Sequence, residues 1–90
     1  MKKQLKATFS GMVQGVGFRF TVERLSRGFQ VNGYVRNLPN GKVELLAEGE
    51  ESVILDFLKA LESEMKEYIQ NKDVTWSESG DHFKNFRIAY

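Results

Sequence analysis

Successive segments of this chain space their apolar residues in two ways: every second residue, as in a strand, and every three or four residues, as in a helix. Alternation over residues 5–10 predicts a strand with one buried face. Residues 18–29 place apolar side chains at helical spacing, and Gly28 is positioned to end that helix. Alternation returns over residues 31–37. The first part of the chain therefore predicts a strand, a helix and a second strand.

A tight turn is predicted directly after the second strand. In the run Leu38-Pro39-Asn40-Gly41, proline presets φ and the Asn-Gly pair accepts positive φ. Residues 43–47 then alternate again, so they are expected to return as the partner strand of a hairpin.

The remaining residues complete the set of elements. An apolar stripe over residues 53–66 predicts a second helix, and residues 73–77 and 85–90 are predicted as strands on either side of a loop at 78–81. The order β-α-β-β-α-β plus a C-terminal strand is typical of one α+β domain, here over residues 1–90. We expect a ferredoxin-like sandwich, in which two helices pack on one face of an antiparallel sheet. Many activities occur on that fold, so the fold class alone does not name the function.

Composition excludes several classes of function. The chain has 13 Lys and Arg against 12 Asp and Glu, a net charge of +1, so it has no broad field to attract nucleic acid or a membrane surface. It contains no cysteine, which removes disulfides, thiolate nucleophiles and zinc-thiolate sites. No apolar run is long enough to span a bilayer, and the N-terminal residues lack the apolar stretch of a signal peptide. A cytoplasmic location is expected.

Two glycines, Gly15 and Gly17, stand between the first strand and the first helix, directly ahead of Arg19. Glycine lets the backbone adopt positive φ and approach a ligand closely. Backbone N–H groups can then converge on a phosphate or carboxylate, assisted by the helix dipole and a guanidinium. The alternative is that the glycines only ease a tight turn and Arg19 is solvated. A nucleotide site is disfavoured, because the Gly-Lys-Ser/Thr of a Walker loop and the third glycine of the dinucleotide motif are both missing.

Asn37 is the second candidate side chain, at the end of a strand that we expect to pair beside the first strand. An amide is short and uncharged, and it both donates and accepts hydrogen bonds, so it can hold a water or a carbonyl in a fixed orientation. The alternative is a turn-entry asparagine that bonds to its own backbone ahead of Leu38-Pro39.

These stretches closely resemble the acylphosphatase family. Residues 11–19 read GMVQGVGFR, similar to that family's phosphate loop, and residues 32–49 read NGYVRNLPNGKVELLAEG, similar to its second block. The C-terminal FKNFRIAY resembles its final strand. Two positions depart from the family pattern: Asn40 stands where aspartate is common, and Gly17 occupies a variable position.

The resemblance implies a small hydrolase of acyl phosphates on a ferredoxin-like fold, acting as a monomer without metal or cofactor. Arg19 would clamp the phosphoryl group and Asn37 would orient the attacking water. Inorganic phosphate would be both product and inhibitor. The backbone amides implied in phosphate binding are those of Gln14, Gly15, Val16, Gly17, Phe18 and Arg19.

Two other classes of function remain open. RNA-recognition domains share this order of elements, but residues 42–47 carry no aromatic side chain for base stacking, and Trp76 is expected to pack on a sheet face or its rim. The other alternative is a sensor that holds phosphate or an acyl group without turnover.

Further residues are given structural roles. His82 is the only histidine and is expected to be a surface loop residue. Met12 and Met65 are expected in the core. Three carboxylates near the start of the second helix are expected to be solvated caps: Glu48, Glu50 and Glu51.

Overall fold

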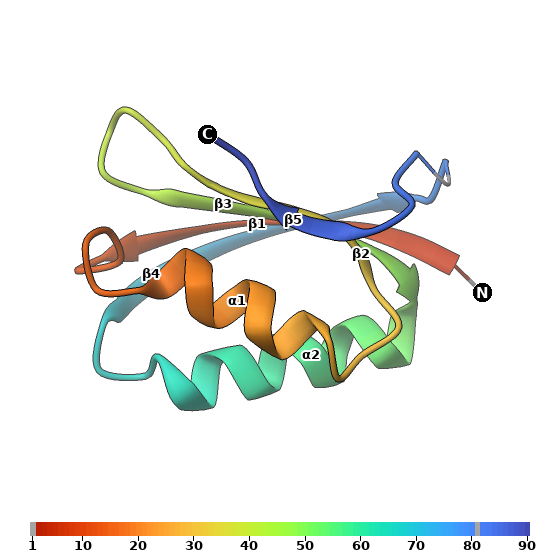
Figure 1. Ribbon diagram of the computed structural model, residues 1–90, viewed down its shortest axis with the longest axis horizontal. Helices are drawn as coiled ribbons and strands as arrows, with labels where there is room; N and C mark the ends of the chain where they lie inside the picture. Colours follow the sequence, from red (N-terminus) through yellow and green to blue (C-terminus); the bar gives the residue numbers. More distant parts are fainter. Residues whose placement is uncertain (1, 81) are drawn as a thin grey trace.

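The computed structural model describes residues 2–80 and 82–90. Its elements are β1 (Lys2–Gly11), α1 (Phe18–Ser26), β2 (Asn32–Asn37), β3 (Val43–Glu50), α2 (Glu51–Glu64), β4 (Ile69–Glu78) and β5 (Phe86–Ile88). They form two layers, a five-stranded sheet and two helices that cover one of its faces (Figure 1). The predicted α+β ferredoxin-like sandwich is confirmed.

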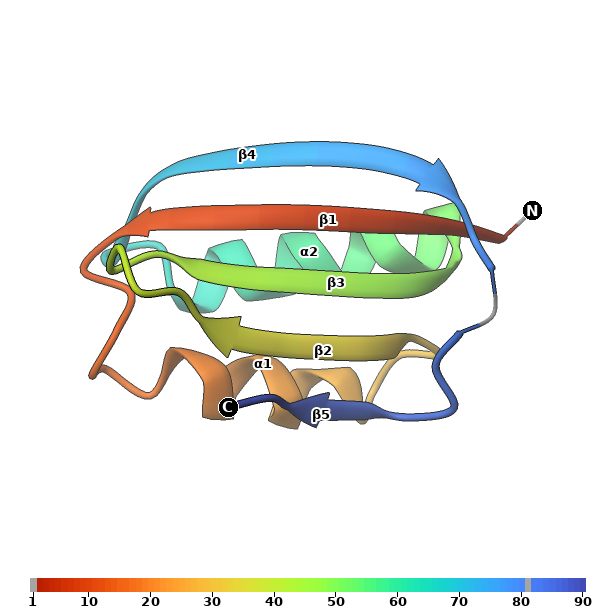
Figure 2. The same cartoon turned by 90° about the horizontal axis from the view of Figure 1, so that it is seen from above.

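The strands lie in the order β4-β1-β3-β2-β5 (Figure 2). The four strands β4, β1, β3 and β2 pair antiparallel, but β5 pairs parallel with β2. The predicted antiparallel sheet is therefore wrong at this edge, and the sheet is mixed. The reason is geometric: β4 ends where β2 begins, so a chain that returns from there along the opposite edge runs in the direction of β2.

Several predicted boundaries also shift. β4 begins at Ile69 and runs through Glu78, so the predicted strand at 73–77 is too short and the predicted loop starts too early. Asp81, the last residue of that loop, lies outside the described residues. β4 is longer because it pairs along almost all of β1, with a register shift between Ser10 and Gly11. Pairing with a neighbouring strand stabilises this polar segment as an edge strand although its own sequence does not alternate.

The core lies between the sheet and the two helices. Leu5, Ala7 and Phe9 of β1 are fully buried, as their alternation predicted, and Met65 is also buried. The prediction for Met12 is wrong, because its side chain is 68% exposed. Met12 follows the register shift at the end of β1, where the chain leaves the sheet.

The face of the sheet away from the helices carries two buried carboxylates on the central strand β3. The prediction that Glu48 is a solvated cap is wrong, because Glu48 is only 4% exposed, whereas Glu50 and Glu51 are exposed as predicted. Glu48 accepts hydrogen bonds from the side chain of Gln4 at 2.9 Å and from the backbone N–H of His82 at 3.0 Å. Burial alone would raise the pKa of Glu48, but these hydrogen bonds together lower it.

Glu44, four positions before Glu48 on the same face of β3, is buried in the same way. Its carboxylate accepts hydrogen bonds from the Tyr34 hydroxyl at 2.8 Å and from Arg36 Nε at 2.7 Å, and Lys6 Nζ lies 3.4 Å away. Burial would raise the pKa of Glu44, yet the hydrogen bonds and the two cations hold that pKa below its ordinary value. Both carboxylates are therefore fixed structural parts of the open face.

Candidate functional site

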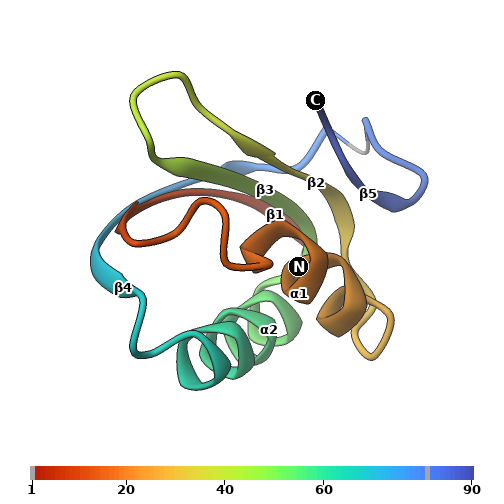
Figure 3. The same ribbon diagram turned by 60° about the vertical axis from the view of Figure 1, so that its left-hand side comes forward.

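The loop between β1 and α1 leaves the sheet, bends through two glycines and enters the helix at Phe18 (Figure 3). Gly15 and Gly17 both have a φ of 78°, the left-handed conformation that residues with a side chain rarely adopt. A Cβ atom at either position would meet nothing within 4 Å. Backbone conformation, not crowding, therefore requires glycine here, and the space beside both residues is open to a ligand.

The backbone N–H groups in the part of this loop that leads into α1 make no hydrogen bond within the described residues. Among the described residues, no hydrogen bond is donated by the main-chain nitrogens from Gln14 to Phe20. The first bond of the helix runs from Thr21 N–H to the Gly17 carbonyl at 2.9 Å. Gly17 caps the helix without a side-chain bond, and the first turn contains no acidic residue. The N-terminal end of α1 therefore presents free donors and an uncompensated positive dipole, as an anion site requires.

Gln14 and Val16 of the predicted phosphate loop direct their side chains elsewhere. Gln14 Nε2 donates to the carbonyl oxygens of Leu38 at 2.8 Å and of Lys42 at 2.9 Å, both in the β2–β3 hairpin. Val16 packs against the core. These two residues can therefore offer a ligand only their main-chain N–H groups, while the Gln14 side chain ties the loop to the hairpin.

Arg19 is the second residue of α1. Its guanidinium carbon lies 5.1 Å from the centroid of the Tyr90 ring, a cation-π contact. No carboxylate of the described residues forms an ion pair with it. The charge of Arg19 is therefore held near an aromatic ring and remains available to an anion.

The side chain of Asn37 contains a hydrogen-bond acceptor to which no described residue donates. Its Oδ1 atom is buried and makes no hydrogen bond within the described part of the chain. The turn-entry interpretation required its side chain to bond the local backbone, but that bond is made by Asn40, whose Oδ1 accepts from Lys42 N–H at 3.0 Å. A buried acceptor without a partner costs about 1–3 kcal/mol, so it needs an explanation, and a bound water or substrate would provide one.

The loop and Asn37 face one hollow of about 240 Å³. The predicted position of Asn37 was wrong in one respect: β3 lies between β1 and β2, so β2 is not beside the first strand. β1 and β2 nevertheless run in the same direction, so their C-terminal ends lie on the same side of the sheet. Asn37, at the end of β2, is therefore near the loop that follows β1. The hollow is lined by Val13, Gly15, Gly17, Phe18, Arg19, Phe20, Asn37, Ile88 and Tyr90.

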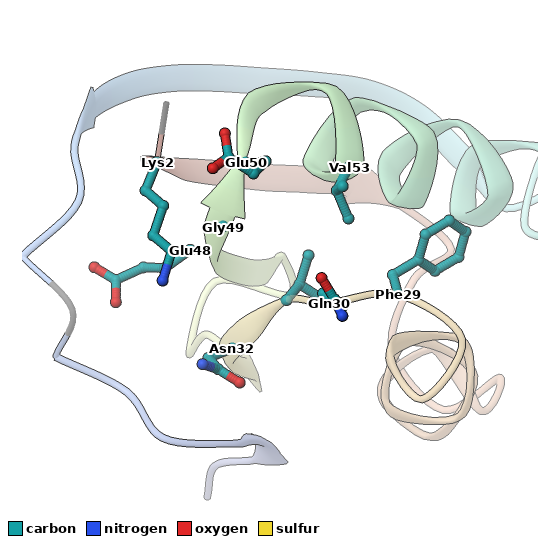
Figure 4. A pocket seen from close by; sticks show the side chains of 9 residues that line it. Lys2, Phe29, Gln30, Asn32, Glu48, Gly49, Glu50 and Val53 are labelled. Carbon is teal, nitrogen blue, oxygen red and sulfur yellow. The ribbon is translucent and has the colours of Figure 1, made fainter.

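A second hollow of about 330 Å³ lies at the opposite ends of β1 and β2. Figure 4 shows Lys2, Glu48 and Asn32 on one side of it and Phe29 and Val53 on the other. None of the predicted site residues lines this hollow, and its buried carboxylate, Glu48, already holds its hydrogen-bond partners. Although it is larger, it is a weaker candidate for chemistry than the hollow at the glycine loop.

Metal-ligating residues do not cluster in the part of the chain that the structure describes. Across residues 2–80 and 82–90, no three His, Cys, Asp or Glu side chains lie close enough together to hold a metal ion. His82 is an exposed loop residue, as predicted, with Nδ1 3.9 Å from a Glu48 oxygen. Neither helix of these described residues is long and apolar enough to cross a membrane.

Comparison with known proteins gives a consistent result along the chain. A sequence model of the family described as Acylphosphatase matches residues 5–88. The acylphosphatase of Salinibacter ruber is 38% identical over 88 residues, which are 97% of this chain and 93% of that protein. The acylphosphatase of Archaeoglobus fulgidus is 38% identical over 87 residues, 96% of this chain and 97% of that protein.

A solved structure supports the same relationship. The crystal structure of acylphosphatase from Bacillus subtilis superposes with a TM-score of 0.88 at 32% sequence identity. The match covers 98% of this chain and 99% of that one. Sequence and fold therefore agree over nearly the whole length.

Proposed function

This chain belongs to the acylphosphatase family, and we propose that its glycine loop, Arg19 and Asn37 together carry out the family's reaction. The chain is an acylphosphatase, a hydrolase of the carboxyl-phosphate bond of acyl phosphates. Our assignment of the site rests on a combination found in one hollow. Within residues 2–80 and 82–90, its main-chain donors are free, its arginine has no ion pair and its buried acceptor has no donor.

The phosphoryl group binds at the mouth of α1. The main-chain N–H groups of residues 14–19 donate hydrogen bonds to the phosphoryl oxygens. The planar guanidinium of Arg19 binds two of these oxygens. Each such charge-assisted hydrogen bond contributes about 1.5–3 kcal/mol. Because phosphoryl transfer depends on positioning and charge stabilisation, this set replaces the metal ion and lysine of nucleotide enzymes.

The attacking water is held by Asn37. Its Oδ1 accepts a hydrogen bond from the water, which satisfies the buried acceptor and points an oxygen lone pair at phosphorus. The water oxygen bonds to phosphorus as the bond to the acyl oxygen breaks, and the electron pair leaves with the carboxylate. The proton of the water passes to the phosphate product or to the solvent.

The leaving group explains why so few side chains suffice. A carboxylate has a pKa of about 4, so it departs without protonation by a general acid. Among the residues that the structure describes, the ionisable side chains that line the hollow are those of Arg19 and Tyr90, which agrees with a reaction of this kind. An alkyl phosphate releases an alkoxide of much higher pKa, and the same site should therefore hydrolyse it poorly.

The remaining features of the proposal concern the cellular setting. The chain acts as a single-domain monomer in the cytoplasm on a small-molecule acyl phosphate, with inorganic phosphate as product and inhibitor. RNA binding is disfavoured because residues 42–47 carry no aromatic side chain for base stacking and the net charge is only +1.

Phosphate release from purified protein tests the proposal. Acetyl phosphate should be hydrolysed over many turnovers, with and without a chelator, while an unactivated alkyl phosphate should give almost no phosphate. Equal rates on the two substrates would contradict the mechanism. Release of no more than one phosphate per protein molecule would favour the sensor, and salt-sensitive retention on RNA would favour the nucleic-acid module.

A further inference from the structure

We propose that Phe20 and Ile88 form an apolar subsite for the acyl group, so that this enzyme favours acyl phosphates with an aromatic or bulky apolar acyl group over acetyl phosphate. The inference rests on the proposed function, because it places the phosphoryl group at the loop and Arg19. Phe20 then becomes a residue that determines substrate specificity.

Phe20 is unusually placed for an aromatic side chain. It is the third residue of α1 and is 65% exposed, although the other face of the same helix buries Phe18 and Val22 in the core. It lines the same hollow as Arg19. A large apolar side chain that is exposed to solvent and also lines a binding hollow is available for contact with a ligand.

Another part of the lining comes from β5 and the residues after it. Ile88 is the last residue of β5 and is partly buried, and Tyr90 beyond it is 99% exposed. The guanidinium carbon of Arg19 on α1 lies 5.1 Å from the centroid of the Tyr90 ring, which places this end of the chain next to the start of the helix. Apolar surfaces from two separate segments, 68 residues apart at Phe20 and Ile88 (88 − 20), therefore face a single hollow.

The polar and apolar linings match the two halves of an acyl phosphate. The free main-chain donors, Arg19 and Asn37 fit the charged phosphoryl end, whereas Phe20 and Ile88 offer nothing to an anion. The acyl carbon is joined to phosphorus through one oxygen, so an acyl group must lie within a few bonds of the phosphoryl site. An acyl group is the occupant that this continuity favours, since a protein partner would not need the apolar patch and the anion site to share one hollow.

Steady-state kinetics on two substrates test the proposal. Acetyl phosphate and benzoyl phosphate are compared for the unchanged protein, Phe20→Ala, Phe20→Leu and the control Leu55→Ala. Leu55 is an exposed apolar residue of α2 that does not line the hollow. The readout is the ratio of the KM for acetyl phosphate to the KM for benzoyl phosphate, in which any general change in activity cancels.

The unchanged protein should have the lower KM for benzoyl phosphate. Phe20→Ala should reduce the ratio about fivefold, the loss expected for one aromatic contact. Phe20→Leu should restore part of it, and Leu55→Ala should not change it. Inhibition by inorganic phosphate, which has no acyl group, should shift much less in Phe20→Ala than the ratio does.

Distinct results would overturn the subsite and the proposed function. Similar KM values for both substrates in the unchanged protein, or an unchanged ratio in Phe20→Ala, would overturn the subsite. An equal rise of both KM values together with an equally weaker inhibition by phosphate would also overturn it, because Phe20 would then only support the loop. Failure of the unchanged protein to hydrolyse either substrate would instead overturn the proposed function.

Discussion

Buried polar side chains have opposite surroundings at two places in this sheet. On the open face, Glu44 and Glu48 accept hydrogen bonds from several donors each. At the end of β2, the Oδ1 atom of Asn37 is equally hidden but accepts none from the described residues. The two carboxylates use their hydrogen-bonding capacity within the fold, whereas the Oδ1 atom of Asn37 remains available to a bound molecule.

The difference separates polar groups that stabilise the fold from the one proposed to bind the attacking water. A buried carboxylate with a full set of donors has a fixed position and a lowered pKa, so it is a poor proton acceptor near neutral pH. A buried acceptor without a donor destabilises the empty protein and is stabilised only by what binds. Substitutions in the two regions should therefore affect different quantities: stability on the open face, and turnover at the loop.

The largest expected effect on the loop side comes from Arg19→Ala. Turnover should fall by about 10³-fold or more, as for arginines that stabilise a transferring phosphoryl group. Inhibition by inorganic phosphate should be lost at the same time. Phosphate release and phosphate competition measure the two effects, and thermal unfolding checks the fold.

Two further variants test whether the effect is specific to the guanidinium of Arg19. Arg19→Lys should restore little activity, because an ammonium cannot bond two oxygens in a fork. Arg87→Ala is the matched control, since Arg87 is an exposed arginine of β5 that does not line the hollow. Normal phosphate inhibition in Arg19→Ala would remove Arg19 from the site.

Asn37→Ala should lower kcat by about 10²-fold, the scale of losing one well-placed polar group in a transition state. KM and phosphate inhibition should change much less, because the phosphoryl donors remain. The variant should be no less stable than the unchanged protein, since it removes an acceptor that lacks a partner.

Asn40→Ala provides the opposite pattern at a neighbouring asparagine. The Oδ1 atom of Asn40 accepts a hydrogen bond within the turn, so its loss should reduce stability by about 1 kcal/mol and leave turnover nearly unchanged. Full turnover by Asn37→Ala would show that this residue does not orient the water.

On the open face, Glu44→Gln should reduce the free energy of unfolding at neutral pH by about 1–2 kcal/mol, because its bonds to charged donors become neutral ones. Turnover of acetyl phosphate should stay within about twofold, as expected for a substitution outside the site. Chemical denaturation and phosphate release measure the two quantities. A large loss of turnover in a folded variant would break the division between the two regions.

The smallest effect concerns pH. Because the pKa of Glu44 is lowered in the folded protein, its contribution is fully present above the ordinary value of 4.5 and is lost as the pH falls below it. The stability difference between the unchanged protein and Glu44→Gln should therefore shrink as the pH falls from 4.5 downward. A difference that grew on acidification would reverse the sign of the assigned shift.

The sequence predicted the backbone conformation of the glycine loop, because that conformation depends on local chemistry. Gly15 and Gly17 were expected to need positive φ, and they have it. The free N–H groups follow from that bend and from the start of the helix. The unpaired Oδ1 atom of Asn37 could not be predicted, since it depends on whether any of the described segments packed around it supplies a donor.

The errors in the fold have the same origin in long-range contacts. The parallel pairing of β5 depends on where β4 ends, and the burial of Glu48 depends on the chain that crosses above it between β4 and β5. No pattern within β3 itself distinguishes Glu48, which is buried, from Glu50, which is exposed. The alternation of apolar residues in a strand predicts which face packs on the helices. It does not predict which polar residues of the other face a later segment will cover.

The hydrogen bonds of Glu48 link distant parts of the molecule. They hold the backbone of Gly80 and His82, in the connection that leads into β5. β5 in turn sets the position of Ile88, on the wall of the hollow at the other end of the sheet. Changes of length or sequence in this connection should therefore widen or narrow the range of substrates accepted, and selection for new substrates has a route that leaves the reacting groups untouched.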